Sequence, residues 1–203
     1  MDNVGNRPVR GQTWETGTAS SPKQSKYREG TLYIYNDTEK QTGVDTPRSG
    51  KQVVMKLVRN VSGVALEAKR IVKYKSGTSR THVDGYCNAD HENVAGAVDE
   101  FVPTAGVPNN HLFLVAVRGP ALIKTSLAGN AQNVISDGDI MTALTAATSQ
   151  ATTAGRVQSF AATSNMTNAV SAAINRIGRA LSAKTTANTN ADLLVDLEIQ
   201  SNQ

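Results

Sequence analysis

Short apolar and β-branched segments recur along the chain from Gln52 to Ile199, and turns containing Gly, Asn or Asp separate them. Short runs of this kind, bounded by turn residues, are typical of β-strands. The pattern predicts strands over 31–35, 52–58, 70–74, 82–86, 93–97, 111–118, 121–125, 133–135, 155–160 and 192–199. Many brief strands favour a mainly β fold, a compact antiparallel β-barrel or sandwich.

One segment, 166–183, departs from this pattern. Its apolar residues fall at spacings of three and four, which predicts a short amphipathic helix; they are Val170, Ala173, Ile174, Ile177 and Leu181. Gly178 and the polar Asn168 and Asn175 oppose a helix, so an irregular crossover loop stays open as the alternative. The Ala/Thr-rich stretch 142–154 predicts a loop or a lightly packed connection. We therefore expect at most one short helix.

Residues 1–30 are rich in Gly, Pro, Ser, Thr and Gln and show no strand or helix period, so they predict a flexible or extended N-terminal arm. Trp14 stands out in this arm, because a lone large aromatic residue either docks back on the body or anchors in a partner pocket. The chain thus divides into the arm, a strand and linker over 31–50, and a barrel-like body over 51–203.

Aromatic residues make up only 4% of the chain, so the core must be built from aliphatic side chains. Such a core buries little area per residue, which favours stabilisation by self-association or by a larger partner. The net charge is +4, but thirteen basic and five acidic residues lie between Lys23 and Arg80, whereas six basic and ten acidic residues follow. This asymmetry favours oriented docking on an acidic surface. The candidate partner-binding residues are Trp14, Arg7, Arg10, Lys56, Arg59 and Lys73.

Cys87 is the single cysteine, so an intramolecular disulfide is excluded and a reducing cytoplasm is the expected place of assembly. The N-terminal stretch lacks the apolar run of a signal peptide, and no window is as long and apolar as a membrane span. We expect neither secretion by a cleaved signal nor membrane insertion.

Potential metal ligands are densest around His82, Cys87 and His91, where three acids are interleaved, but their spacing matches no structural zinc pattern. A polar loop with a buried thiol is expected there, without a metal. The adjacent carboxylates Asp99 and Glu100 are typical of a solvated loop. The chain also lacks a Gly-x-Ser-x-Gly elbow and a phosphate-binding loop. We therefore predict no catalytic residues and no cofactor; a hydrolase using His82 or His111 is a third hypothesis.

The basic stretch 48–80 is compatible with a nucleic-acid path, in which Lys56, Arg59, Lys73 and Lys75 would contact phosphates and Tyr74 would stack on bases. Too few aromatic residues are present for a stacking surface, and lysines on a strand also protect sheet edges. We favour a solvated or protein-facing basic strand and keep a basic β-barrel that binds nucleic acid as the alternative function.

From Asn60 onward the order of segments resembles the capsid decoration, or cement, proteins of tailed bacteriophages. The segments that carry the resemblance are Asn60-Val-Ser-Gly-Val-Ala-Leu66, Arg70-Ile-Val72, Gly96-Ala-Val-Asp-Glu100, Leu114-Val-Ala-Val-Arg-Gly-Pro120, Ser136-Asp-Gly-Asp139, Ala154-Gly-Arg-Val157, Ile177-Gly-Arg-Ala-Leu181 and Leu193-Leu-Val-Asp-Leu197. The arm before residue 50 is not part of it.

The resemblance implies a non-enzymatic virion protein on the capsid exterior, assembled in the host cytoplasm. Its partner would be the major capsid protein, whose neighbouring subunits it would tie together, with self-association into trimers or other oligomers on the capsid. Neither a membrane nor nucleic acid is an expected partner. An arm that adds a strand to a neighbour's surface would suit this role, and repeated weak contacts on a symmetric shell would supply the affinity.

Overall fold

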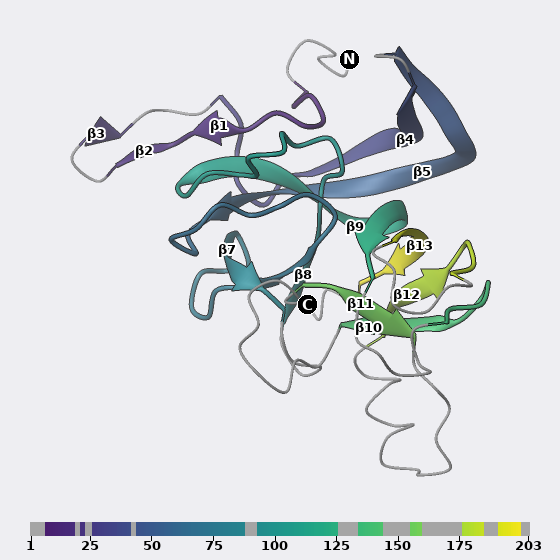
Figure 1. The fold of residues 1–203 in the computed structure, drawn as a ribbon. Coiled ribbons are helices and arrows are strands. Elements are labelled where there is room, and N and C mark those ends of the chain that lie inside the picture. The colour runs from purple at the N-terminus through teal and green to yellow at the C-terminus, as the bar shows by residue number, and fades with distance from the viewer. Residues whose placement is uncertain are drawn as a thin grey trace.

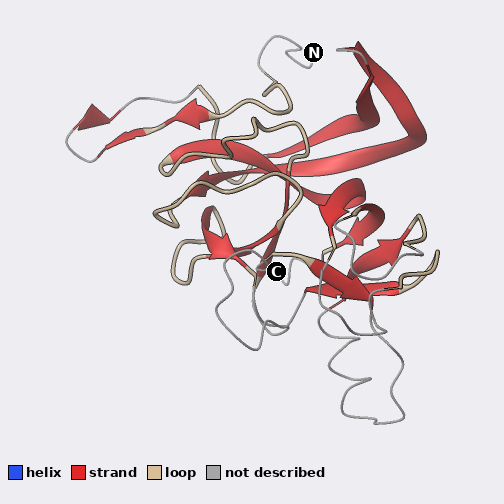
Figure 2. Ribbon diagram, in the orientation of Figure 1, coloured by secondary structure: helices blue, strands red, loops and turns tan. Residues whose placement is uncertain are grey.

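The structure is a computed structural model that describes residues 7–18, 21–22, 26–41, 44–87, 93–125, 134–143, 155–159, 176–184 and 191–199. In these ranges the regular elements are all strands, which confirms the prediction of a mainly β fold (Figures 1 and 2). They are β1 (Trp14–Glu15), β2 (Gly17–Thr18), β3 (Ser21–Pro22), β4 (Leu32–Gln41), β5 (Val44–Asn60), β6 (Ile71–Tyr74), β7 (His82–Tyr86), β8 (Val94–Val98), β9 (His111–Lys124), β10 (Ile140–Ala143), β11 (Val157–Ser159), β12 (Arg176–Ala180) and β13 (Asp192–Glu198).

Eleven strands form one large sheet, in the order β11-β10-β12-β13-β9-β8-β6-β7-β5-β4, with β1 paired to β9. Five of them, β5, β9, β8, β6 and β7, form a closed circuit, because β9 also pairs with β5. The sheet is mixed, since β5 and β7 run parallel through Arg59↔His82 and Asn60↔Val83. The expected purely antiparallel barrel or sandwich is thus replaced by a mixed sheet that is not a clean barrel. The chain reverses at β6 and again at β7, which makes β7 parallel to β5.

Strand β9 connects the circuit to the rest of the sheet. Its first half pairs with β5, whereas the residues from Arg118 to Lys124 pair with β13. Sequence reasoning predicted two strands that end and begin around Gly119-Pro120, but the structure has one bent strand. Gly119 has a φ of +88°, and a Cβ there would lie 2.2 Å from the carbonyl oxygen of Gln52. Only glycine lets β9 approach β5 this closely at the point where the pairing of β9 passes from β5 to β13.

Strand β9 of the circuit is buried on both faces. Alternating residues of β9 enter two different cores: Phe113 and Val115 join one core, while Leu112 and Leu114 join the other. The first core draws members from all five strands of the circuit and therefore lies within it. The second packs β5 and β9 against β10, β12 and β13. Two buried faces explain why the β9 sequence is a continuous apolar run rather than an alternating one.

Two further predictions need correction. The expected linker up to residue 50 is strand, because all described residues from 32 to 50 belong to the β4–β5 hairpin. The expected helix over 166–183 is wrong for its last part, where Arg176–Ala180 is β12 and pairs with β10 and β13. A Cβ at Gly178 would lie 2.1 Å from the Asp196 carbonyl oxygen, so this glycine allows the strands to approach. Residues 166–175 and 144–154 lie outside the described residues.

Candidate interaction surfaces

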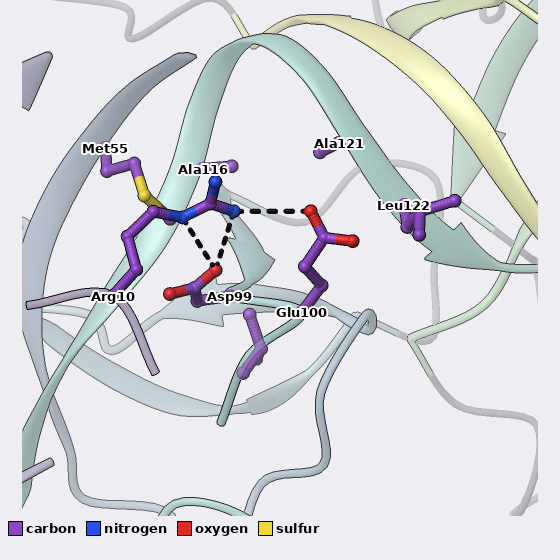
Figure 3. A pocket seen from close by; sticks show the side chains of 8 residues that line it. Arg10, Met55, Asp99, Glu100, Ala116, Ala121 and Leu122 are labelled. Carbon is purple, nitrogen blue, oxygen red and sulfur yellow. Dashed lines mark hydrogen bonds and ion pairs between the residues drawn. The ribbon is translucent and has the colours of Figure 1, made fainter. Parts of the chain in front are cut away.

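A cluster of charged side chains joins the N-terminal segment to the body. Arg10 donates from Nε and Nη2 to Asp99 Oδ1 over 3.2 and 2.9 Å, and from Nη2 to Glu100 Oε1 over 3.3 Å (Figure 3). Arg48 of β5 donates to both oxygens of Glu100 over 3.0 and 3.1 Å and to Asp37 of β4 over 2.5 Å. These five residues are called the charge cluster below. It links three parts of the chain that are far apart in sequence.

The charge cluster is buried and holds three carboxylates for two guanidinium groups. The side chains of Asp37 and Asp99 are fully buried, and those of the two arginines are about nine-tenths buried. Burial raises the pKa of Glu100, although Arg48 opposes this shift. Burial would lower the pKa of Arg48, but hydrogen bonds to Asp37 and Glu100 outweigh it and raise that pKa. The adjacent carboxylates Asp99 and Glu100 were expected in a solvated loop; that expectation is wrong, because two arginines neutralise them.

The cavity beside the cluster is too small for a ligand. It measures about 10 Å³ and is lined by Arg10, Asp99 and Glu100 on one side and by Met55, Ala116 and Leu122 among the apolar side chains (Figure 3). Such a volume holds one water molecule at most. The charge cluster therefore holds the N-terminal segment on the body, and the cavity beside it leaves no room for a substrate.

Further contacts hold residues 10–16 on the body. The Gly11 N–H donates to Asp99 Oδ2 over 2.8 Å, and the Thr16 hydroxyl donates to the Asn110 carbonyl over 2.5 Å. Strand β1 pairs with the start of β9. Trp14 packs against the larger core and meets Tyr27 edge to face, with ring centroids 4.9 Å apart. Of the two hypotheses for Trp14, the structure shows it docked on its own body.

In the described part of the chain, the segment after β1 does not pair with the large sheet. Strands β2 and β3 pair only with each other and form a separate two-stranded sheet among the described residues. In Figure 1 this hairpin extends to the side of the molecule, beyond β1 and away from the large sheet. The β2–β3 hairpin is thus the part of the arm that projects.

An open groove lies between the N-terminal segment and the β4–β5 hairpin. Its volume is about 710 Å³, and its lining includes Arg7, Val9, Ile34, Tyr35, Thr38 and Phe101. Arg7 is exposed and lies over the Tyr35 ring, 3.9 Å from its centroid. The Tyr35 hydroxyl donates to the Pro8 carbonyl over 2.6 Å, and burial raises the pKa of Tyr35 to about 12. Val9 and Ile34 expose 57% and 53% of their surface, so the groove offers apolar contacts.

The other basic residues predicted to bind a partner do not line this groove. The Lys56 ammonium lies 4.9 Å from the Tyr74 ring centroid and donates to its hydroxyl over 3.0 Å. Arg59 pairs with Glu29, which also lies 3.2 Å from His82 Nε2. Lys73 is half-buried on β6. Of the six predicted residues, the structure brings Arg7 and Arg10 together at the groove and leaves Trp14, Lys56, Arg59 and Lys73 elsewhere.

The residues considered for catalysis or metal binding are spread out. His82 contacts Glu29, and His111 Nδ1 lies 3.3 Å from the Thr13 hydroxyl. Cys87 is a buried free thiol, while His91 lies outside the described residues. Within the described ranges, no three His, Cys, Asp or Glu side chains are grouped to hold a metal ion. The same ranges contain no helix with the length and hydropathy needed to cross a membrane.

The sequence did not indicate that three further basic side chains are buried. Arg70, Arg156 and Lys184 are at least nine-tenths buried although they come from distant segments. Arg156 donates to the Thr125 carbonyl over 2.9 Å; burial and the nearby Arg70 lower its pKa. Burial, followed by the charge of Arg156, lowers the pKa of Lys184. No local pattern could have indicated this grouping, because only the tertiary fold brings these residues together.

The chain was compared with protein-family models and with curated proteins. No protein-family model matches the chain. No curated protein matches it either.

Proposed function

We propose that the protein is a non-enzymatic structural protein of a virion, which binds the outer surface of the capsid and stabilises contacts between major capsid subunits. The observation that supports this most directly is the β2–β3 hairpin, which pairs with no other described strand. An isolated two-stranded hairpin is marginally stable in water, so a partner surface is needed to order it. The resemblance of the body's segments to decoration proteins suggests a capsid as that surface.

The placement of the hairpin fits a role in attachment. The charge cluster and β1 fix the residues before it, so the hairpin starts from a defined point on the body. Preorganisation of this kind lowers the ordering cost of binding. On a symmetric shell, many copies would each add a weak contact, and together these would strengthen the particle.

The alternative function, nucleic-acid binding by the basic strands, has less support. Lys56 is engaged by Tyr74 and Arg59 by Glu29, so these two proposed phosphate contacts already have intramolecular partners. Phosphate binding by exposed basic side chains would give steeply salt-dependent retention on DNA. We expect no such retention, and its observation would favour the alternative.

Attachment is tested by replacing residues 17–25 with a short Gly/Ser linker, which leaves the charge cluster and β1 intact. The variant should unfold at the same denaturant concentration as the unmodified protein but should no longer co-sediment with virus particles. A matched control is Val64→Ser, because Val64 is an exposed apolar residue in a turn; this variant should attach normally. Undiminished attachment without the hairpin would remove the main support for the proposal. We also expect purified particles to contain this protein in a fixed ratio to the major capsid subunit. Its absence from such particles would likewise remove the support for the proposal.

A further inference from the structure

The outer edge of β4 is unpaired in the described part of the chain. β4 is the last strand of the large sheet, and its one described neighbour is β5. The carbonyl of Thr31 accepts a hydrogen bond from the Leu57 N–H over 3.0 Å. Because backbone groups alternate in an antiparallel pair, those of Leu32, Ile34 and Asn36 are directed away from β5. They form a row of donors and acceptors that another strand can use.

This edge lacks the features that usually prevent pairing. Residues 31–36, Thr-Leu-Tyr-Ile-Tyr-Asn, contain neither a charge nor a proline. Leu32 and Ile34 point to the same face and expose 59% and 53% of their surface. A register shift interrupts β4 only beyond Asn36. Proteins commonly protect edge strands with lysine, proline or bulges, so an unprotected apolar edge indicates a strand-pairing site.

We propose that β4 pairs antiparallel with β4 of a second copy of this chain, about a two-fold axis through Tyr33. In this register Leu32 lies opposite the partner's Ile34, and Ile34 lies opposite the partner's Leu32. The outward-directed backbone groups then face each other, as a hydrogen-bonded pair requires. A two-fold contact needs a surface that complements itself, which this edge provides.

Neighbouring registers fit less well. A shift of two residues in one direction places Leu32 opposite the partner's Asn36, and a shift in the other direction places Ile34 opposite the partner's Gly30. Either shift loses apolar cross-strand pairs, which stabilise sheets. The proposed register is the one in which both exposed side chains meet an apolar neighbour.

An open groove lies beside the same part of β4. The groove of about 710 Å³ borders β4 from Ile34 to Thr38 and is open to the outside. Val9, which also lines the groove, is 57% exposed. Pairing at this edge would join the large sheets of the two copies through β4.

The proposal is tested by measuring the solution mass by light scattering over a range of concentrations. We expect twice the 21.5 kDa chain mass for the unmodified protein and a single chain mass for Ile34→Lys. Val64→Lys is the matched control, because Val64 is 57% exposed but lies in a turn away from β4; it should remain dimeric. The unfolding midpoint of Ile34→Lys checks its fold. A monomeric unmodified protein, or a dimeric Ile34→Lys variant, would overturn the proposal.

The register is tested with Tyr33→Cys. Residue 33 would face its own copy in a non-hydrogen-bonded pair, at a Cα separation of about 4.5 Å, which a disulfide can bridge. Oxidation should yield a covalent dimer in Tyr33→Cys but not in Val64→Cys, and the buried Cys87 should not contribute. If Tyr33→Cys stays uncrosslinked although it folds, the register is wrong.

This inference does not depend on the capsid function. Replacing the β2–β3 hairpin should leave the dimer intact, so loss of attachment and loss of dimer formation are separate results. A monomeric protein whose Ile34→Lys variant fails to attach to particles would assign the edge to a capsid strand instead and would overturn pairing between copies.

Discussion

The guanidinium group of Arg10 binds the carboxylate of Asp99, 89 positions later in the chain, through two hydrogen bonds of 3.2 and 2.9 Å. Asp99 is fully buried and also accepts from the N–H of Gly11. Residues 10 and 11 are therefore part of the folded body. A partner that engages the β2–β3 hairpin would therefore bind a segment whose preceding residues are already held on the body.

Arg10→Met should destabilise the protein by about 3 kcal/mol, because it leaves the carboxylate of Asp99 buried without its cation. Limited proteolysis should then cut the N-terminal segment faster, since its main attachment is lost. Lys51→Met is the control: its pair with Asp196 is exposed, and such pairs contribute about 0–1 kcal/mol. Urea unfolding measures both variants, and equal midpoints would show that the charge cluster does not fasten the arm.

Tyr35 predicts a loss of stability in alkali. Its pKa is about 12 in the folded state, whereas an ordinary tyrosine has a pKa of 10.0, so the unfolded chain loses this proton first. The free energy of unfolding should therefore fall as the pH rises from 10 through 12. Tyr35→Phe removes this contribution, and its stability should decline less over the same window. Urea unfolding at several pH values compares the two; parallel curves would contradict the prediction.

The stability contributed by Glu100 should change with pH in the opposite direction from that of most carboxylates. Burial raises its pKa above 4.5, so the folded state takes up a proton more readily than the unfolded state. Its contribution to stability is therefore full below pH 4.5 and decreases as the pH rises through the folded-state pKa. The stability of the unmodified protein relative to Glu100→Gln should fall over that range. Asp45→Asn, which removes an exposed carboxylate from β5, serves as the control.

Gly119→Ala should be markedly more destabilising than Gly138→Ala. Both glycines have positive φ, +88° and +84°, so alanine carries a similar backbone cost of about 1–2 kcal/mol at each. Only at Gly119 would the new Cβ lie 2.2 Å from the backbone oxygen of Gln52, whereas nothing lies within 4 Å at Gly138. Thermal unfolding of the two variants measures the difference. Similar values would mean that β9 and β5 can separate locally at little cost.

Local sequence patterns predicted the mainly β fold and several of its strands. The segments around Val72, Val83 and Phe113 were predicted as strands and form β6, β7 and β9. The error at 176–180 has a local cause: Ile177 and Leu181 match a helical spacing, but Gly178 is placed against the backbone of β13. A short apolar run is compatible with either element, and pairing with neighbouring strands decided it.

The candidate surfaces could be predicted only in part. Trp14 was predicted to bind a partner, with docking on the body left open; the structure places it against Tyr27 and the larger core. The charge cluster was missed, since nothing near Asp99 in sequence shows that Arg10 and Arg48 will reach it. The exposed edge was missed as well, because residues 31–36 look like any half-buried strand until the sheet order places β4 last.

By itself, the sequence determined that this chain folds from strands and fills its cores with aliphatic side chains, because strand preference and apolar patterning act between near neighbours. Only the tertiary structure decided that β5 and β7 run parallel, that carboxylates after β8 are buried against Arg10 and Arg48, and that Leu32 and Ile34 remain on an open edge. These features depend on contacts between residues far apart in the chain, for which local patterns carry no signal.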